Sequence, residues 1–336
     1  MEPHHPQKGP FVNDLRAGER VVGFYQARHK QLEPFRDRSK GNFLTVILSD
    51  RTGQILARVW EEAADLAAAF EVGDVIKVAG DVEEYLGRAQ LIVQKLRPAQ
   101  AGEYHLADFL PATTRDVAAL WAQVRAAIDQ IENPHLASLV RHFYDAPGSQ
   151  ESFAQAPASR RLHHAYLGGL LEHLTDVLAL GDAVLALYPD LSRDLLVSGA
   201  LLSALGVLRA YAWETEITIT DEGRLVGPTV LAAQQVSAAI EGLPGFPPAL
   251  RLRVEHMLVS HRGRPEWGAP RRPQTLEAIA LHHVQELSAQ LNRFREVLGA
   301  RRDPAQPWTD YDRLLGRQLY AGTADDLGQD GPEVLE

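Results

Sequence analysis

Two strand-like runs and the turn between them make up the stretch Phe43-Leu44-Thr45-Val46-Ile47-Leu48-Ser49-Asp50-Arg51-Thr52-Gly53-Gln54-Ile55-Leu56-Ala57-Arg58-Val59-Trp60. Aliphatic, β-branched and aromatic residues favour strands, and the polar Asp-Arg-Thr-Gly at 50–53 has the composition of a hairpin turn. The sequence therefore predicts two strands, at 43–48 and 55–60, that form one hairpin.

Three further runs of the same kind surround this hairpin. One precedes it at 21–25, and two follow it at 75–80 and 89–93. A short helix is expected at about 61–70, between the third and fourth strands. Five strands with a helix in that place is the order of an OB-fold barrel. We therefore expect residues 11–98 to form a five-stranded OB-fold β-barrel.

The second part of the chain, residues 116–320, is predicted to be helical. Apolar residues recur there every three or four positions, as on the buried face of a helix. Residues 99–115 are expected to be a linker, and the acidic, Gly-rich residues 321–336 a disordered tail. The predicted fold class is therefore α+β multidomain, with the OB barrel followed by an all-α domain. Helical patterns recur at about 134–144, 163–187, 191–211, 228–241, 248–260, 273–297 and 309–320, with a polar hairpin at 216–226.

Composition limits the classes of function. The 336 residues include no cysteine, so disulfides and thiolate metal sites are excluded and a metal must bind His, Asp or Glu. No signal-peptide segment and no run of 18 uncharged apolar residues is present, which favours a cytoplasmic protein with no membrane partner. Walker-type, dinucleotide-binding and serine-nucleophile motifs are also missing from the sequence.

The net charge of −10 is unevenly distributed along the chain. Residues 1–98 contain 14 Lys and Arg against 14 Asp and Glu, so the acidic excess lies entirely in the remainder. Binding of nucleic acid needs a local basic groove and not a basic total. The charge balance therefore leaves nucleic-acid binding open for the barrel.

The loop between the first two predicted strands is basic. In OB folds this loop borders the nucleic-acid groove, where Lys and Arg meet phosphates and aromatic rings stack on bases. An aromatic residue in these strands also fits the barrel core, and a basic loop also fits a solvated surface, so these alternatives stay open. The candidate nucleic-acid contacts are Arg28, Lys30, Arg36, Arg38 and Lys40, with the aromatic residues Tyr25, Phe43, Trp60 and Tyr85.

The densest group of chemistry-bearing residues is Leu162-His163-His164-Ala165-Tyr166-Leu167-Gly168-Gly169-Leu170-Leu171-Glu172-His173. Its Gly-Gly pair has no side chains, so a ligand or another helix can approach the backbone closely. The alternative is that the glycines only allow helix packing and the histidines belong to the core or surface. The candidate nucleic-acid contacts here are His163, His164, Tyr166, Gly168 and Gly169.

This string is one of several that follow one another in a recognisable order: 221–227, His256-Met-Leu-Val-Ser-His261, 266–268, 275–279 and Trp308-Thr-Asp-Tyr. Together they resemble the YhaM-type 3′–5′ exoribonuclease family over residues 11–320. The family joins an OB domain to an HD domain that holds one or two divalent metals. The resemblance therefore implies a metal-dependent phosphodiesterase that acts on single strands.

The resemblance also places the family's metal site on this chain, with most ligands replaced. Ser203 and Ala204 stand where the His-Asp pair is expected, and Gln285 where a ligand Asp is expected. Pro228 and Arg262 stand at two expected His positions. Serine, alanine and glutamine bring no negative charge to offset divalent cations, so the catalytic positions are predicted to be degenerate. The remaining candidate metal ligands are His173, His256 and His261.

The predicted function is binding of single-stranded RNA or DNA by a catalytically impaired relative of these exoribonucleases. Three imidazoles would still hold one Mn²⁺ or Zn²⁺ ion if they converge, which keeps an active 3′–5′ exonuclease with a reduced site as the alternative. A non-catalytic protein-interaction partner is the second alternative, and a homo-oligomer is left open. Arginine fits phosphate geometry, so Arg262, Arg271 and Arg272 are expected to contact the strand even without cleavage.

Overall fold

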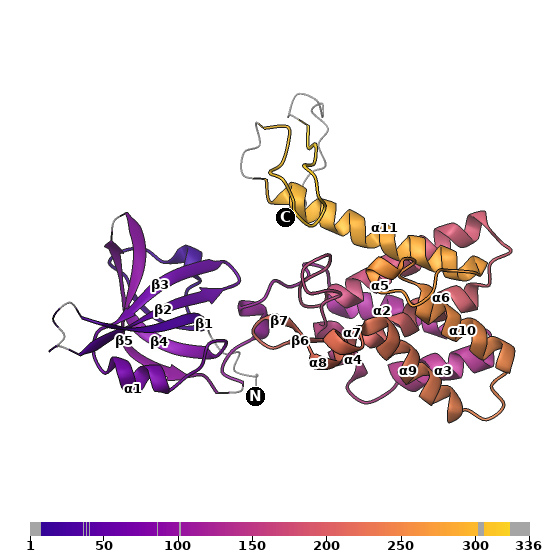
Figure 1. Cartoon of the computed structure of the whole chain (residues 1–336), viewed down its shortest axis with the longest axis horizontal. Helices are drawn as coiled ribbons and strands as arrows, with labels where there is room; N and C mark the ends of the chain where they lie inside the picture. Colours follow the sequence, from indigo (N-terminus) through magenta and orange to yellow (C-terminus); the bar gives the residue numbers. More distant parts are fainter. Residues whose placement is uncertain are drawn as a thin grey trace. The chain divides into compact units, whose positions relative to one another are not determined.

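The computed structural model describes residues 8–35, 37, 39, 41–85, 87–100, 102–301 and 306–322. The chain divides into two compact units, drawn in Figure 1. The first is Met1–Ala112 with Trp213–Ile217, and the second is Thr113–Ala212 with Thr218–Glu336. The first is a β-barrel and the second is helical, so the predicted α+β multidomain class is confirmed.

The barrel closes in the strand order β1-β2-β3-β5-β4. Its β3 and β5 strands pair in parallel, and the other neighbours pair antiparallel. The predicted helix, α1 (Ala63–Ala68), lies between β3 and β4 in the chain. The strands are β1 (Arg20–Pro34), β2 (Asn42–Asp50), β3 (Gly53–Val59), β4 (Val75–Tyr85) and β5 (Arg88–Pro98).

Alternate residues of these strands fill the barrel. Leu44, Leu48 and Leu91 are fully buried, as period-two patterning requires. The register shifts between Ala79 and Gly80, where β4 passes very close to β5. A Cβ on Gly80 would lie 2.2 Å from the carbonyl oxygen of Ile92, so only glycine fits there.

Residues 99–112, expected as part of a linker, belong to the first unit. Phe109 is buried against Phe24 and Val75, and Tyr104 meets its ring edge-on at 5.4 Å between centroids. The 3-10 helix η3 (Leu106–Asp108) precedes Phe109. This segment is therefore packed against the barrel wall.

The second unit is built from short and medium helices. Asp116, Asn133 and Thr275 accept hydrogen bonds from first-turn backbone N–H groups and so begin α2, α3 and α11. The helices are α2 (Val117–Asp129), α3 (Pro134–Tyr144), α4 (Ser149–Gln155), α5 (Gly169–Leu187), α6 (Arg193–Ser203), α7 (Leu205–Ala210), α8 (Asp221–Leu225), α9 (Pro228–Glu241), α10 (Pro248–Ser260) and α11 (Leu276–Gly299).

Helix α5 packs against α2, α6 and α11 in the core of this unit. Helix α9 packs against α7 at Gly206, where a Cβ would lie 1.8 Å from the carbonyl oxygen of Pro228. Pro228 itself is the first residue of α9, where its missing N–H costs nothing. Among the described residues, no helix is long and apolar enough to cross a membrane.

Several predicted helix bounds are wrong. The pattern at 163–187 becomes a helix only from Gly169, because His164 and Gly168 adopt left-handed backbone conformations with φ of 44° and 76°. The stretch at 309–320 is not helical and is held by isolated bridges between Trp308 and Tyr320 and between Asp312 and Arg317. The polar hairpin is β6 (Tyr211–Trp213) with β7 (Ile217–Ile219), and α8 follows it. The expected tail lies outside the described residues from 323 onward.

Candidate functional site

The helical unit contains a cavity of about 520 Å³. The loop before α5, helix α5 itself, the junction of α6 and α7, the loop after α10, and α11 all contribute to its walls. Leu314 and Leu315, from the segment after α11, also line it. Stretches that are far apart in sequence therefore meet around one space, as expected of a ligand-binding site.

Two of the expected family positions meet inside this cavity. Gln285 of α11 donates a hydrogen bond of 2.9 Å from Nε2 to the hydroxyl of Ser203, at the end of α6. Ser203 in turn donates to the carbonyl of Ala200 at 2.8 Å. Ala204 lines the same wall. The side chains that stand at ligand positions thus satisfy one another as a neutral pair.

Three imidazoles lie close together, and two of them, those of His163 and His173, line the cavity. His163 and His173 have ring centroids 4.8 Å apart, and His164 lies 5.2 Å from His173. One ring nitrogen of each lies within 4.8 Å of those of the other two. Burial, and then the neighbouring His164, lower the pKa of His173 to about 3. Burial also places the pKa of His163 well below its usual range, so both rings are neutral at pH 7.

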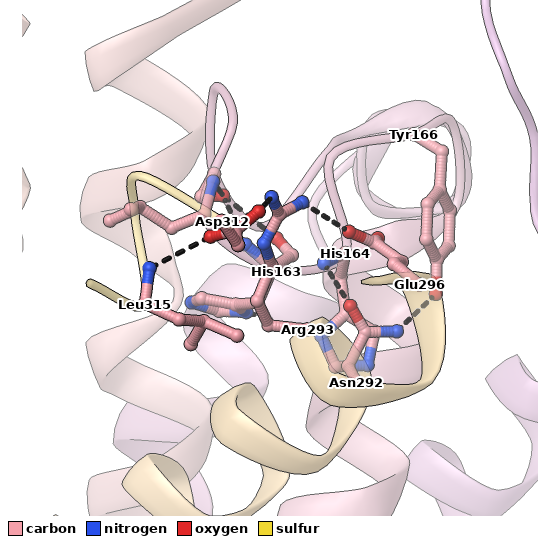
Figure 2. Close-up of polar contacts among 10 residues, drawn as sticks. His163, His164, Tyr166, Asn292, Arg293, Glu296, Asp312 and Leu315 are labelled. Atoms are coloured by element: carbon pink, nitrogen blue, oxygen red, sulfur yellow. Dashed lines mark hydrogen bonds and ion pairs between the residues drawn. The ribbon is translucent and has the colours of Figure 1, made fainter. Parts of the chain in front are cut away.

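His164 is held by the protein on several sides. Its backbone N–H donates to Asn292 Oδ1 at 2.6 Å, and Asn292 Nδ2 donates to the Tyr166 hydroxyl at 3.0 Å (Figure 2). Its Nε2 lies 3.9 Å from Asp176 Oδ2, and Asp176 also pairs with Arg115 at 2.8 Å. The His164 ring is therefore a buried, oriented part of the protein, and Tyr166 is held beside it.

The glycine pair is closely packed against protein, and its contact with nucleic acid stays a prediction. A Cβ on Gly168 would lie 2.7 Å from Thr113 Cγ2, and one on Gly169 would lie 2.2 Å from the His164 carbonyl oxygen. Both glycines are buried. The geometry favours the alternative for this motif, in which the glycines allow close backbone packing.

The three predicted metal ligands do not converge. His173 and His261 line the cavity, but His256 does not. Its Nε2 accepts a hydrogen bond from the Gln274 N–H at 2.9 Å. Each residue of a helix turns about 100° around its axis. Five residues therefore turn by about 500°, so positions 256 and 261 lie roughly 140° apart around the axis of α10. His256 is therefore corrected from a candidate ligand to a residue that anchors the loop before α11.

His261 is fixed in one tautomer by its surroundings. Its Nδ1 lies 2.7 Å from the Leu258 carbonyl oxygen, which only accepts, so Nδ1 carries the proton. Burial, and then the charge of Arg262, lower the pKa of His261 to about 3. The ring is therefore neutral and its Nε2 is an acceptor.

Arg262 brings a positive charge to this cavity. Its side chain is half-buried and lines the cavity together with His261 and the imidazoles of His163 and His173. Its charge contributes to lowering the pKa of His163, His173 and His261. Within the part of the chain that the structure describes, no carboxylate forms an ion pair with it.

His282, Glu286 and Trp267 also line the cavity and were not among the predicted site residues. His282 Nδ1 lies 3.1 Å from the His261 carbonyl oxygen, and its Nε2 lies 3.5 Å from Glu286 Oε2. The sequence carried a signal for this pair, because positions four apart share one helix face. Gly263 passes against the His282 ring with φ of 74°.

The segment after α11 is tied to the cavity by Arg293. This guanidinium bonds both Glu296, at 3.1 Å, and Asp312 (Figure 2). Asp312 Oδ1 accepts from the Leu315 N–H at 2.8 Å. Burial of Asp312 opposes its ionisation. The hydrogen bonds from Leu315 and Arg293 outweigh this effect, so the pKa of Asp312 is lowered. Leu314 and Leu315 are thereby held at the cavity wall.

The donor set does not fit a bridged pair of divalent cations. The expected ligand positions 203, 204 and 285 hold no carboxylate, and Ser203 and Gln285 are already bonded to each other. Two dications need anionic ligands to offset their charge, whereas Arg262 adds a further positive charge. His163, His164 and His173 offer the donor type of a single three-imidazole ion, and His282, His283 and Glu286 form a second group with two imidazoles and one carboxylate.

On the barrel, Tyr25 is corrected from a stacking residue to a core residue. It is fully buried, and its hydroxyl donates to the Pro10 carbonyl at 2.7 Å. Phe43 packs with Phe35 and Trp60 at centroid distances of 5.3 and 5.2 Å, and Arg58 lies over its ring. Trp60 and Tyr85 remain exposed.

The basic candidates differ in their contacts. Arg28 bonds the Ser49 hydroxyl and pairs with Glu216, and Lys30 donates to Ala67 and pairs with Glu71 at 3.0 Å. These two cations therefore already have protein partners. Arg271 and Arg272 are exposed. Arg36, Arg38 and Lys40 lie outside the described residues.

The barrel matches the family model of the OB-fold nucleic acid binding domain over residues 21–99. The chain thus carries an OB-fold nucleic-acid-binding domain followed by a helical second unit. The chain is 32% identical over 307 residues to the 3′–5′ exoribonuclease YhaM of Shouchella clausii, covering 90% of this chain and 93% of that relative. It is 32% identical over 257 residues to the YhaM enzyme of Bacillus pumilus, covering 76% and 81%. The chain belongs to the YhaM 3′–5′ exoribonuclease family.

Among solved structures, the second OB-fold domain of replication protein A from Methanococcus maripaludis is 21% identical with a TM-score of 0.24. The match covers 27% of this chain and 94% of that domain.

Proposed function

We propose that this protein binds single-stranded RNA and has little or no hydrolytic activity of its own. The observation that carries the proposal is the Gln285–Ser203 hydrogen bond in the cavity that Arg262 also lines. Six of the positions where the resemblance places ligands line this cavity, and they hold neutral side chains and one cation: His173, Ser203, Ala204, His261, Arg262 and Gln285. A pocket of this kind suits a phosphate better than it suits divalent metals.

The barrel supplies the second part of the proposed interaction. Trp60 is 43% exposed and forms one aromatic surface with Phe35 and Phe43. Exposed rings stack on any base, and Arg58 beside Phe43 adds a cation next to them. RNA is chosen over DNA because the relatives are named exoribonucleases.

The test is binding of a labelled single-stranded RNA, followed by its digestion with Mn²⁺. We expect saturable binding that weakens with salt, and Trp60→Ala should weaken it by about tenfold, in line with 1–3 kcal/mol per stacked base. Tyr188→Ala is the matched control, because Tyr188 is 59% exposed and lies in the other unit. Robust digestion that His173→Ala abolishes would overturn the loss of activity, and absence of RNA binding would overturn the proposal entirely.

An active exonuclease with one metal is the second candidate. It is favoured by the His163, His164 and His173 cluster and by the Glu286 carboxylate on the cavity wall. Metal analysis of the purified protein separates the two, because only the second candidate requires a stoichiometric bound ion. A cytoplasmic location, a homo-oligomer and a role as a protein-interaction partner stay predictions.

A further inference from the structure

Arg262 is a cation at the cavity that lacks an acidic partner among the described residues. Arg293, which lines the same cavity, is instead paired with Asp312 and Glu296. Glu266 and Glu286 also line it, but Glu286 lies beside His282 and His283, and neither carboxylate is within 4.0 Å of Arg262. A half-buried guanidinium without a protein carboxylate is available to bind an anion from solution.

The surroundings of Arg262 favour an anion over a cation. Neutral imidazoles, the Ser203–Gln285 pair and apolar side chains such as Leu170 and Leu174 line this region together with Glu266 and Glu286, and Glu286 lies beside His282 and His283. Near a protein surface the attraction between a guanidinium and a phosphate is stronger than in bulk water. The planar guanidinium also matches two phosphate oxygens at once.

We propose that this cavity binds a phosphate group through Arg262 without a metal ion. The inference rests on the proposed function and deepens it, because the phosphate source that the family suggests is the end of a single RNA strand. A free mononucleotide carries the same group. A cavity of about 520 Å³ is within the usual range for small-ligand sites, so it has room for a phosphate together with its sugar and base.

The first experiment uses inorganic phosphate and the full-length protein in the presence of EDTA. We expect saturable calorimetric binding to the wild type and a melting temperature that rises with phosphate concentration, since only the folded state binds. Arg262→Gln should weaken binding at least about tenfold, whereas Arg262→Lys should retain part of it. Arg224→Gln is the control, because Arg224 is exposed on α8 and does not line the cavity.

Four results would overturn the proposal. The first is a wild type that shows no saturable phosphate binding, which needs no variant to be folded. The second is binding that depends on added Mn²⁺, and the third is binding that is unchanged in folded Arg262→Gln. Binding that Arg224→Gln weakens equally would also contradict it, because it would report a general surface effect and not this cavity.

The second experiment identifies the source of the phosphate. A short RNA with a 3′-phosphate, the same RNA with a 3′-hydroxyl, and a nucleoside monophosphate are compared on wild type and Arg262→Gln. A gain of about tenfold from the 3′-phosphate, lost in Arg262→Gln, supports the strand end. Tight monophosphate binding without that gain points to free nucleotide and overturns the strand-end assignment. Retained binding of the 3′-hydroxyl RNA by the variant shows that the proposed function stands even if the phosphate site fails.

Discussion

Gly263 passes so close to His282 that a Cβ on the glycine would lie 2.2 Å from the imidazole ring. This contact joins the loop after α10 to α11 and so fixes one wall of the cavity. The φ of Gly263 is 74°, a backbone conformation that also favours glycine at this position.

Gly263→Ala is therefore expected to destabilise the helical unit by about 2 kcal/mol or more, through overlap with the His282 ring as well as backbone strain. Differential scanning calorimetry should show a melting temperature lowered by several degrees. Gly245→Ala is the matched control, because Gly245 has the same φ of 74° and no atom lies within 4 Å of the position that its methyl group would take. If the two substitutions lower the melting temperature equally, the contact between Gly263 and His282 contributes nothing to the loss of stability.

Restoring the family's ligands should restore affinity for a metal. Ser203→His, Ala204→Asp and Gln285→Asp together add two carboxylates and one imidazole to the cavity that His173 and His261 already line. We expect calorimetry to show Mn²⁺ binding to this triple variant, and a further increase when Arg262→His removes the opposing charge. A folded triple variant that binds no Mn²⁺ would mean that these positions do not form the family's site.

Binding of single strands should lose salt dependence when the basic loop is neutralised. Changing Arg36, Arg38 and Lys40 to Ala is expected to weaken RNA binding and to reduce the slope of log K against log salt by about 0.7 for each lost phosphate contact. Fluorescence anisotropy at several salt concentrations measures both. Lys95→Ala on β5 is the control, since it removes an exposed charge from another part of the barrel. An unchanged slope in the loop variant would show that this loop does not contact the RNA phosphates.

The buried histidines should make the protein less stable in acid. Burial lowers the pKa of His173 and His261 to about 3, so below the ordinary value of 6.5 the unfolded chain takes up protons that the folded chain refuses. Their contribution to stability is therefore complete above pH 6.5 and is lost as the pH falls toward 3. At pH 5 each histidine is expected to cost up to about 2 kcal/mol relative to pH 7.5.

Urea denaturation across this pH range measures the effect. His261→Asn should reduce the number of protons taken up on unfolding by about one, and His142→Asn, at an exposed position on α3, is the matched control. A stability that does not vary between pH 7.5 and 5 would contradict the neutral, buried state of both rings.

The barrel was predictable because its signals are local. Strand alternation and the turn at 50–53 are read from neighbouring residues, and β2 and β3 pair in the register that this turn sets. Which face of β1 is buried was less clear, because Tyr25 lies in a run that is buried on both faces. The sequence pattern therefore could not separate a core tyrosine from a stacking one.

The cavity was predictable only in part. The meeting of Ser203 and Gln285 was implied by the family resemblance, whereas the position of His256 depends on how α10 is rotated in the unit. The turns at His164 and at 308–320 depend on distant partners, Asn292 and Arg293, which no local pattern reveals. Apolar spacing near Leu314 suggested a helix, but Gly316 at φ of 65° and the Asp312 bonds hold a non-helical turn instead.

The hydrogen bond between Ser203 and Gln285 also couples these two positions in any substitution of either residue. Exchanging either residue alone leaves the other side chain without its partner in a poorly solvated place, which costs roughly 1–3 kcal/mol. Each single step toward a metal ligand is therefore harmful before the second step can help, so the two sites depend on each other. Under the proposed function, metal ligands at positions 203 and 285 would therefore have to be introduced together.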